Sequence, residues 1–112
     1  MAVTVTRLAS GVWTGTMDLL GQNAGKARIV AAIRVVNKGT TTATLNLSAW
    51  RATNAQGTEG DERLILPKDL RLPAGYQLIE EKELTLNDLD KLKGSASGGS
   101  LEYHISGIER AK

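Results

Sequence analysis

The stretch KARIVAAIRVVNKGTTTATLNLSAW, residues 26–50, decides the fold class of this chain. Its first half is apolar on both alternating faces, which is typical of a central β-strand covered on both sides. A turn signal follows at residues 37–39, because Asn and Gly tolerate positive φ. From Thr40 to Trp50 the pattern alternates cleanly and is rich in Thr, whose β-branched side chain packs well on a pleated surface. These residues therefore predict two strands joined by a turn.

The sequence on either side of this stretch also shows strand patterns. Upstream, VTVTRLA and GVWTGTM predict strands rather than helices. Downstream, residues 51–63 are polar and predict the longest loop. The two prolines of PKDLRLP restrict that piece to an edge strand or an ordered connection, because proline cannot donate to a central ladder. PAGYQLIEEKELTL begins at a turn and continues as a strand, and SLEYHISGI alternates until Gly107, where we predict a β-bulge.

Together these patterns predict an all-β chain of seven to eight short strands. Turn signals every eight to twelve residues or so are typical of a single antiparallel β-sandwich, Ig-like or jelly-roll. We expect one domain over residues 1–112, in which residues 1–10 form an N-terminal strand or an arm. The inward faces of the best-patterned strands supply the expected core, which consists of Ile29, Ile33, Val35, Leu45, Leu47, Tyr103 and Ile105.

The composition argues against several classes of protein. With 14 Lys and Arg against 12 Asp and Glu, the net charge is +2 and no basic stripe stands out, so a nucleic-acid partner is not expected. The absence of cysteine excludes a disulfide framework, a thiol nucleophile and cysteine-ligated zinc. The first ten residues lack a signal-peptide pattern, and the longest aliphatic run, IVAAI, is far too short to span a membrane. We therefore expect neither export nor a membrane partner.

The stretch TLNDLDKLKG, residues 85–94, admits three interpretations. Asn87 could cap a helix of fewer than two turns, with acidic residues in its first turn and lysines in its last. A calcium loop would need several further oxygen ligands at set spacings, where this sequence supplies lysines. We favour a strand corner in which Asp88 or Asp90 accepts hydrogen bonds from backbone amides and no metal is bound.

No catalytic constellation stands out in the sequence. His104 is the single histidine and falls on the polar face predicted for the last strand. Glu80 and Glu81 are consecutive, so on a strand they face opposite ways and cannot act as paired carboxylates. GSASGGS lacks the Lys-Ser/Thr ending of a phosphate loop, and the serine of ISGIE lacks the frame of a hydrolase nucleophile. We therefore expect a protein that is not an enzyme and needs no cofactor.

Two stretches resemble a known family. LPAGYQLIEEKELTLNDLDKLKGSASGGSLEYHISGIER, residues 72–110, looks like the C-terminal half of a group of small virion proteins of tailed bacteriophages. In that group a Pro-x-Gly turn leads into a strand, an x-Gly-Asp turn opens the next, and the chain closes on Ser-Gly-x-Glu. GKARIVAAIRVVNKGTTTATLNLSAW, residues 25–50, is similar to their first half. The similarity spans most of residues 8–110, and Leu89 stands where the group usually has Gly before the Asp.

The resemblance implies a β-sandwich structural component of a virion, used in several copies on the capsid, the neck or collar, or the tail. Such a protein would be assembled in the host cytoplasm and would bind copies of itself and neighbouring virion proteins. We expect a cyclic homo-oligomer. Its mechanism would be adhesion through edge strands and exposed apolar side chains.

Five residues are the candidates for a subunit or partner contact. Trp50 falls on the face opposite the core leucines, and Arg51 follows it; aromatic and Arg side chains are enriched where partners dock. Trp13 is the second exposed-aromatic candidate. Val3 and Val5 alternate with Thr but have no adjacent hairpin signal, so this segment could pair with a neighbouring subunit. The competing interpretation is that the first strand completes its own sandwich and both tryptophans cover the core.

The alternative function is a carbohydrate- or receptor-binding sandwich of a fibre or a cell-surface protein. Sugar sites carry exposed aromatic platforms beside amide and acidic side chains. Trp13 and Trp50 are the candidate platforms, and Asn54 and Gln56 lie in the polar segment after Trp50. We favour the virion role over a glycan-binding role.

Overall fold

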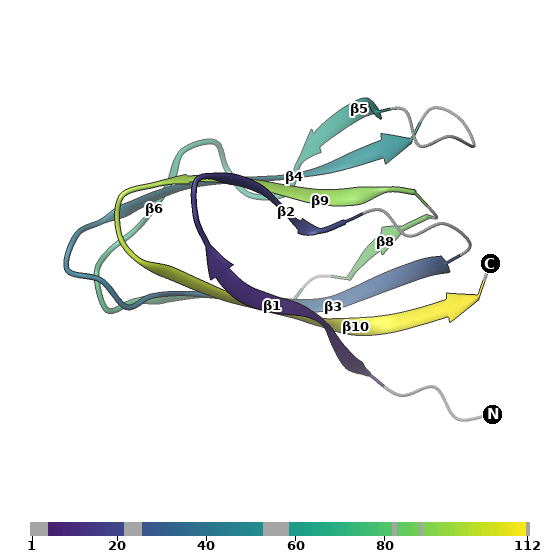
Figure 1. The fold of residues 1–112 in the computed structure, drawn as a ribbon, viewed down its shortest axis with the longest axis horizontal. Coiled ribbons are helices and arrows are strands. Elements are labelled where there is room, and N and C mark those ends of the chain that lie inside the picture. Colours follow the sequence, from purple (N-terminus) through teal and green to yellow (C-terminus); the bar gives the residue numbers. More distant parts are fainter. Residues whose placement is uncertain (1–4, 22–25, 53–58, 82, 88, 112) are drawn as a thin grey trace.

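A computed structural model describes residues 5–21, 26–52, 59–81, 83–87 and 89–111. This part of the chain contains ten β-strands and no helix, and the strands form two antiparallel sheets that pack face to face (Figure 1). The strands are β1 (Thr6–Trp13), β2 (Thr16–Leu20), β3 (Lys26–Asn37), β4 (Ala43–Ala52), β5 (Glu59–Leu64), β6 (Leu70–Leu72), β7 (Gln77–Glu80), β8 (Leu84–Leu86), β9 (Lys91–Ser97) and β10 (Leu101–Ala111). The all-β antiparallel sandwich is therefore confirmed, with more strands than predicted.

Each sheet contains five strands from distant parts of the chain. Sheet A has the order β1-β10-β3-β7, and β8 also pairs with β3. Sheet B has the order β2-β9-β4-β5, and β6 also pairs with β4. Along its described strands the chain changes sheet six times, between β1 and β2, β2 and β3, β3 and β4, β6 and β7, β8 and β9, and β9 and β10. The two sheets lie one above the other in Figure 1. Within the described residues, no helix has the length and apolar character needed to span a membrane.

The core lies between the two sheets. Its fully buried side chains include leucines from both sheets together with Val35 of β3 and Ile105 of β10. Six of the seven residues that we expected in the core are buried there: Ile33, Val35, Leu45, Leu47, Tyr103 and Ile105. Ile29 is the exception, because it is only half-buried.

A bulge in β3 explains the misplaced residue. Where β3 pairs with β10, the register shifts between Ser106 and Gly107, and Ala31 of β3 has no opposite residue. The additional residue reverses the alternation of β3, so Val30 points into the core in place of Ile29. The predicted bulge at Gly107 therefore lies at the correct point of the sheet, but the extra residue belongs to β3 and not to the last strand.

Three other segments differ in detail from the prediction. The segment expected to be the longest loop, residues 51–63, contains the end of β4 and most of β5, which pair with each other. Because this segment is polar, the sequence did not indicate β5, an edge strand of sheet B that pairs only with β4. PAGYQLIEEKELTL forms two short strands, β7 and β8, where one was expected. The piece between the prolines contains β6, an edge strand, as predicted.

The first strand belongs to its own sandwich. From Thr6 to Trp13, β1 pairs with β10 of the same chain, so of the two alternatives given for residues 1–10, a strand or an arm, the structure shows the strand from Thr6 onward. β10 is the last strand in the sequence, so its pairing with β1 is a long-range contact that no local hairpin signal predicts. Residues 1–4 lie outside the described part of the chain.

One face of β3 is covered by less protein than the sequence suggested. We expected this strand to be covered on both sides, because both of its faces are apolar. The inward face is buried, but Ile29, Ala32 and Val36 on the outward side are only half-buried, and the described strands form two sheets with no third layer over sheet A. In the single chain this apolar face of β3 is therefore partly open to solvent.

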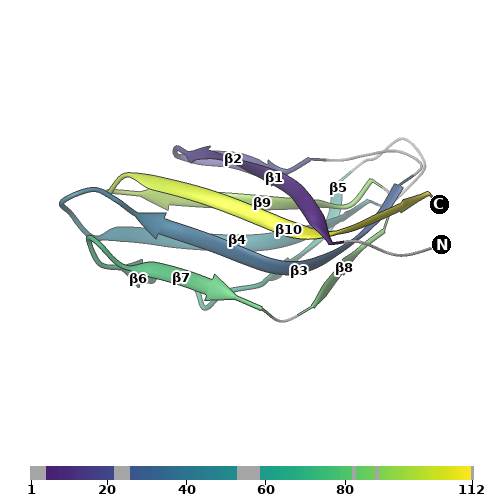
Figure 2. The same ribbon diagram turned by 90° about the horizontal axis from the view of Figure 1, so that it is seen from below.

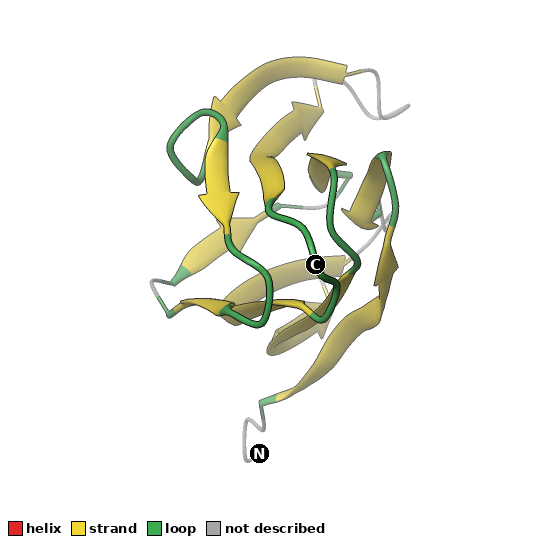
Figure 3. Cartoon of the chain, turned by 90° about the vertical axis from the view of Figure 1, so that its left-hand side faces the viewer, coloured by secondary structure: helices red, strands yellow, loops and turns green. Residues whose placement is uncertain are grey.

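The side chain of Asn37 organises one end of the sandwich, which faces the viewer in Figure 3. Asn37 is fully buried at the end of β3. Its Nδ2 donates hydrogen bonds to the carbonyl oxygens of Thr41 (2.8 Å) and Leu72 (2.9 Å). Its Oδ1 accepts hydrogen bonds from the N–H groups of Gly39 (3.0 Å) and Ser100 (3.2 Å). One amide therefore ties together the β3–β4 turn, the end of β6 and the β9–β10 turn.

Truncation of Leu47 is expected to destabilise the fold. Leu47 is fully buried between the sheets, so replacing it with alanine should lower the free energy of unfolding by ~2–5 kcal/mol through lost burial and the cavity left behind. Leu64 provides the matched control, because 56% of its surface is exposed and its replacement should cost under about 0.5 kcal/mol. Urea unfolding measures both. Equal effects of the two variants would contradict the assignment of the core.

Candidate functional site

Trp50 lies on the outer face of sheet B, where β4 runs between β9 and β5. The register of β4 with β9 places Lys91 opposite Trp50 and Lys93 opposite Ser48, so alternate β9 side chains project beside the indole ring. The Nζ atoms of Lys91 and Lys93 lie 5.9 Å and 5.0 Å from the ring centroid, within the range of cation–π contacts. The ring is half-buried beneath these two cations.

Polar contacts hold the residues around Trp50 in place. The Nζ of Lys91 lies 3.5 Å from Oδ1 of Asp18, and the lysine side chain is only 11% exposed. Ser48 donates a 2.6 Å hydrogen bond from its hydroxyl to Oε2 of Glu62, a short charge-assisted contact. The Nε1 of Trp50 is buried and has no hydrogen-bond partner within the described residues. The outer face of sheet B therefore presents an ordered surface in which apolar and charged groups alternate.

A pocket of about 260 Å³ lies beside Trp50, between the β4–β5 hairpin and β8. Arg51 and Arg63 contribute cationic groups to its lining, and Leu84 and Leu86 contribute aliphatic ones. Among the described residues that line the pocket there is no histidine, cysteine or serine. Thr85, Asn87 and Asp90 also line it, so cationic, polar, acidic and aliphatic groups meet in this pocket.

The corner after β8 has the structure that we favoured from the sequence. The N–H of Asn87 donates a 3.0 Å hydrogen bond to Oδ2 of Asp90, and the N–H of Asp90 donates a 3.1 Å bond to the carbonyl oxygen of Asn87. Asp90 is buried, and its carboxylate closes the turn. The predicted strand corner is therefore confirmed for Asp90, whereas Asp88 lies outside the described residues.

Arg28 is a buried cation that sequence reasoning missed. Only 3% of its surface is exposed, and its Nη2 donates a 2.8 Å hydrogen bond to the carbonyl oxygen of Asp90. Burial lowers the pKa of Arg28, and the negative charges of Glu109 and Asp90 oppose that shift. The expected alternation placed Ile29 inward and hence Arg28 outward, so the bulge in β3 is the reason for the miss. Arg28 anchors the corner after β8 to sheet A.

Leu89 adopts a left-handed backbone conformation inside this corner, with φ of 68°. This is the position at which the bacteriophage group usually has Gly. A left-handed conformation costs a non-glycine residue roughly 1–2 kcal/mol, and glycine avoids most of that cost. We therefore expect Leu89→Gly to be more stable than Leu89→Ala by about 1 kcal/mol in urea unfolding, since both variants lose the same leucine contacts.

The control for this comparison is the same pair of substitutions at Ser97. Ser97 is exposed near the end of β9 and its backbone is not left-handed. There alanine should be more stable than glycine, because glycine loses more conformational entropy on folding. The same order at both positions, with alanine the better residue, would show that the turn at Leu89 carries no backbone strain.

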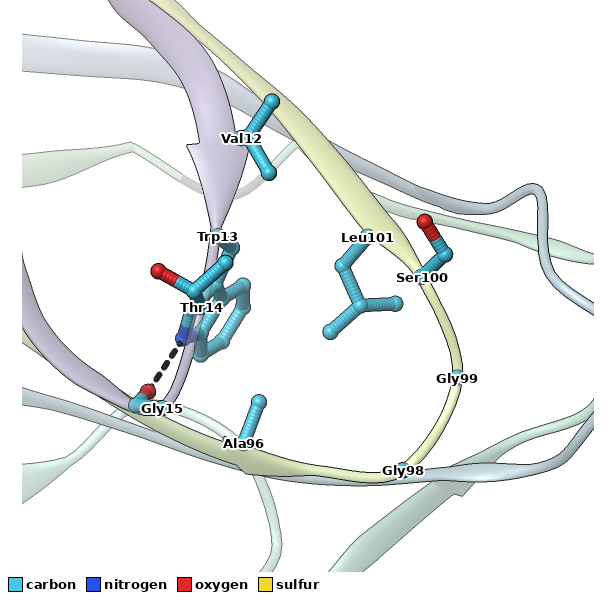
Figure 4. Close-up of a pocket in the computed structure, with 9 residues that line it drawn as sticks. All are labelled: Val12, Trp13, Thr14, Gly15, Ala96, Gly98, Gly99, Ser100 and Leu101. Carbon is cyan, nitrogen blue, oxygen red and sulfur yellow. Dashed lines mark hydrogen bonds between the residues drawn. The ribbon is translucent and has the colours of Figure 1, made fainter.

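Trp13 is a core residue and not a surface contact, which corrects the sequence-based prediction. It forms one wall of a second pocket of about 260 Å³, between the β1–β2 corner and the β9–β10 turn (Figure 4). Only 2% of Trp13 is exposed, and its Nε1 donates a 3.1 Å hydrogen bond to the carbonyl oxygen of Gly15. Its ring packs so closely on β9 that a Cβ at Gly94 would lie 2.8 Å from the ring atom Cε2. The neighbouring Val12 is 53% exposed.

The remaining candidate residues are only partly described. Val5 precedes β1 and is 54% exposed, which is consistent with a contact position. Arg51 is exposed beside Trp50. Val3, Asn54 and Gln56 lie outside the described residues. Trp50 and Arg51 both line the pocket beside β8, whereas Val5 immediately precedes β1, an edge strand of sheet A.

His104, the single histidine, is the remaining side chain to consider for a catalytic role. His104 is exposed on β10, opposite Ser10 on one side and Arg34 on the other. In the part of the chain that the structure describes, no group of three or more His, Cys, Asp or Glu side chains is placed to hold a metal ion.

Comparison with known proteins finds likeness in structure only. No family model and no curated protein matches the chain. A chain in the crystal structure of the T13 particle of infectious bursal disease virus has a TM-score of 0.63 and 13% identity, and the match covers 98% of this chain and 31% of that chain. A chain of the same virus, strain Gx, gives 0.62 and 16%, covering 96% and 32%. A mutant VP2 protein of this virus in derived T=1 particles gives 0.61 and 14%, covering 98% and 32%.

These matches establish the fold. The chain spans about a third of the length of the viral chains that it resembles. At 13–16% identity, the shared feature is the arrangement of strands and not a set of side chains. The β-sandwich of this protein is therefore an architecture that also occurs in chains of viral particles.

Proposed function

We propose that this protein is a non-enzymatic structural component of a virion, present in several copies and held by contacts with itself and with neighbouring virion proteins. One observation carries the proposal: almost the whole chain, 98% of it, superimposes on part of a chain from a viral particle. The bacteriophage resemblance of residues 25–50 and 72–110 supports a tailed phage as the source. Under this proposal the protein is assembled in the host cytoplasm and sits on the capsid, the neck or collar, or the tail.

The rigid build of the sandwich supports this role. The turns at one end are tied to the buried amide of Asn37, and the corner at the other end is tied to Asp90 and Arg28. A structural component needs a fixed shape more than a mobile site, because shape complementarity positions its neighbours. We propose Trp50 and Arg51 as a contact with a neighbouring virion protein, since aromatic and Arg side chains are enriched at such contacts.

Purified particles provide the test of the proposed function. Viral particles from a culture that produces this chain are separated on a density gradient, and the protein content of the particle band is measured by mass spectrometry. We expect the chain in the particle band in several copies per particle, and a map of the particle should show a sandwich of this shape. Recovery of the chain only in the soluble fraction, with no corresponding density in the map, would refute the proposal.

The carbohydrate-binding alternative has little support from the surface. Trp13 is buried, and the amines of Lys91 and Lys93 lie over the ring of Trp50, where a sugar would have to stack. A glycan array separates the two functions. Specific binding that is lost in Trp50→Ala would favour the alternative, whereas the virion role predicts no specific binding.

A further inference from the structure

Sheet A has two outer edges, one formed by β1 and the other by β7 and β8 (Figure 2). Among the described strands, β1 pairs with β10, and both β7 and β8 pair with β3. The outer edge of a sheet presents a row of backbone N–H and C=O groups that can pair with another strand. Each edge therefore offers the main-chain half of a strand-to-strand contact.

Exposed apolar side chains concentrate at these two edges. Five large hydrophobic residues of the described chain are markedly exposed, with values from 41% to 64%. Val5 and Val12 lie at the two ends of β1, and Tyr76 and Ile79 lie at β7. The fifth, Leu64, belongs to sheet B. Polar or charged residues at these positions would protect the edges better against pairing with another chain. The apolar residues found there therefore favour a contact at both edges.

The two edges carry opposite charge. Arg7 is exposed on β1, which is otherwise uncharged from Thr6 to Trp13. Glu81 and Glu83 are exposed in the short connection between β7 and β8. A second copy of this chain therefore supplies the charge that each edge lacks, which identifies the chain itself as the complementary partner.

Strand direction also permits this contact. Along the path β1-β10-β3-β7 every neighbouring pair is antiparallel, so β1 and β7 run in opposite directions. If β7 of one copy lies beside β1 of another that has the same orientation, the new pair is again antiparallel. No reversal of either copy is needed, so the same contact can repeat from copy to copy.

The register brings the complementary groups together. Residues that lie opposite one another form rows across β1, β10, β3 and β7 of sheet A. One such row runs from Ser10 in β1 through His104 and Arg34 to Ile79 in β7. Arg7 of β1 lies opposite Ser106 of β10, which lies opposite Ala32 of β3. The pairing of β3 with β7 ends at Ile33 and Glu80, so the next position along brings Glu81 into the same row as Arg7. A second copy added without a shift along the strands would therefore place its Glu81 opposite Arg7.

We propose that copies of this protein associate head to tail through these edges, with β1 of one copy beside β7 and β8 of the next. Sheet A then continues from one copy into the next, and the pair formed by Arg7 and Glu81 sets the register. Such a contact uses two different surfaces of each copy, so it closes into a ring when the rotation between copies allows. This inference deepens the proposed function because it names the contact between copies, but it is tested on the isolated protein.

The test is a charge exchange followed by sedimentation velocity over a series of concentrations. The wild-type chain should self-associate, and Arg7→Glu and Glu81→Arg should each raise the dissociation constant about 10-fold or more, because each places like charges opposite one another. The double variant R7E/E81R should restore association, since the pair is present again with its charges exchanged. Arg71→Glu is the matched control, because Arg71 is exposed on the edge strand β6 of the other sheet.

Each outcome decides the proposal. Melting curves by circular dichroism show that the variants are folded, which is expected because both side chains are exposed. A wild-type chain that remains monomeric at every concentration would overturn the inference, as would single variants that associate like the wild type or a double variant without recovery. Failure here would leave the chain's presence in viral particles unaffected, because the particle measurement does not depend on how copies touch.

Discussion

Replacement of Asn37 with alanine is expected to lower the free energy of unfolding by about 4–6 kcal/mol, because four hydrogen bonds of one buried amide disappear together. The carbonyl oxygens of Thr41 and Leu72 and the N–H groups of Gly39 and Ser100 would lose their common partner. Each buried polar group left unsatisfied costs roughly 1–3 kcal/mol. Urea unfolding followed by circular dichroism measures the loss.

Two further variants show whether the amide itself is responsible. Asn37→Asp keeps the volume and an acceptor but loses both donors, so its carboxylate would face the two carbonyl oxygens and retain at least half of the loss. Asn46→Ala is the control, because this amide makes its hydrogen bonds with Asp69 at the surface, donating one of 3.0 Å to Oδ1 and accepting one of 2.9 Å from the N–H, and their loss should cost under about 1 kcal/mol. If Asn37→Ala cost no more than Asn46→Ala, the three turns would have to be held by other contacts.

The sequence predicted the parts of the fold that depend on local pattern. From Ala43 to Ala49 apolar and polar residues alternate strictly, and β4 contains no bulge before Trp50, so Leu45 and Leu47 face the core as expected. The corner at Asp90 is also local, because an Asp side chain bonds amides of its own turn. In both cases the determining contacts lie within a few residues of one another.

The phase of β3 could not be predicted, because both of its faces are apolar and a shift by one residue changes little in the pattern. The bulge at Ala31 forms against β10, a strand from the far end of the chain. That non-local contact exchanges the positions of Ile29 and Val30 and buries Arg28. An alternation rule applied to one strand has no means of locating such a contact.

The candidate contact residues were harder to place than the core. The strand pattern gave a reason to place Trp50 on the outer face but none for Trp13, and the packing of Trp13 against Gly94 shows that it is internal. Trp50 was expected on the outer face and lies there, but its covering by Lys91 and Lys93 depends on the register of β4 with β9. Pairing between distant strands decides these environments, and a single sequence does not specify which strands pair.

At Gly107 of β10 the neighbouring strands β3 and β1 leave no room for a side chain. This glycine is opposite the bulge of β3, and a Cβ built on it would fall on the carbonyl oxygen of Ile29. On the other side, the same Cβ would lie 3.0 Å from Cδ1 of Leu8, next to an irregularity in the register of β1. Its φ is not in the left-handed region, so glycine is required here for space and not for conformation.

The substitution Gly107→Ala is therefore expected to lower the free energy of unfolding by about 4 kcal/mol or more, beyond the usual cost of overpacking, because the obstacle is a backbone carbonyl and not a movable side chain. Relief of the collision would require β3 and β10 to separate at the centre of the sheet. Gly21→Ala is the matched control: a Cβ there meets no atom within 4 Å, and the change should stay within about 0.5 kcal/mol. Urea unfolding of the two variants gives the comparison. Equal stability of both would mean that the bulge at Ala31 can relax without loss of the ladder, and that the close approach of β3 to β10 is not a constraint on this sequence.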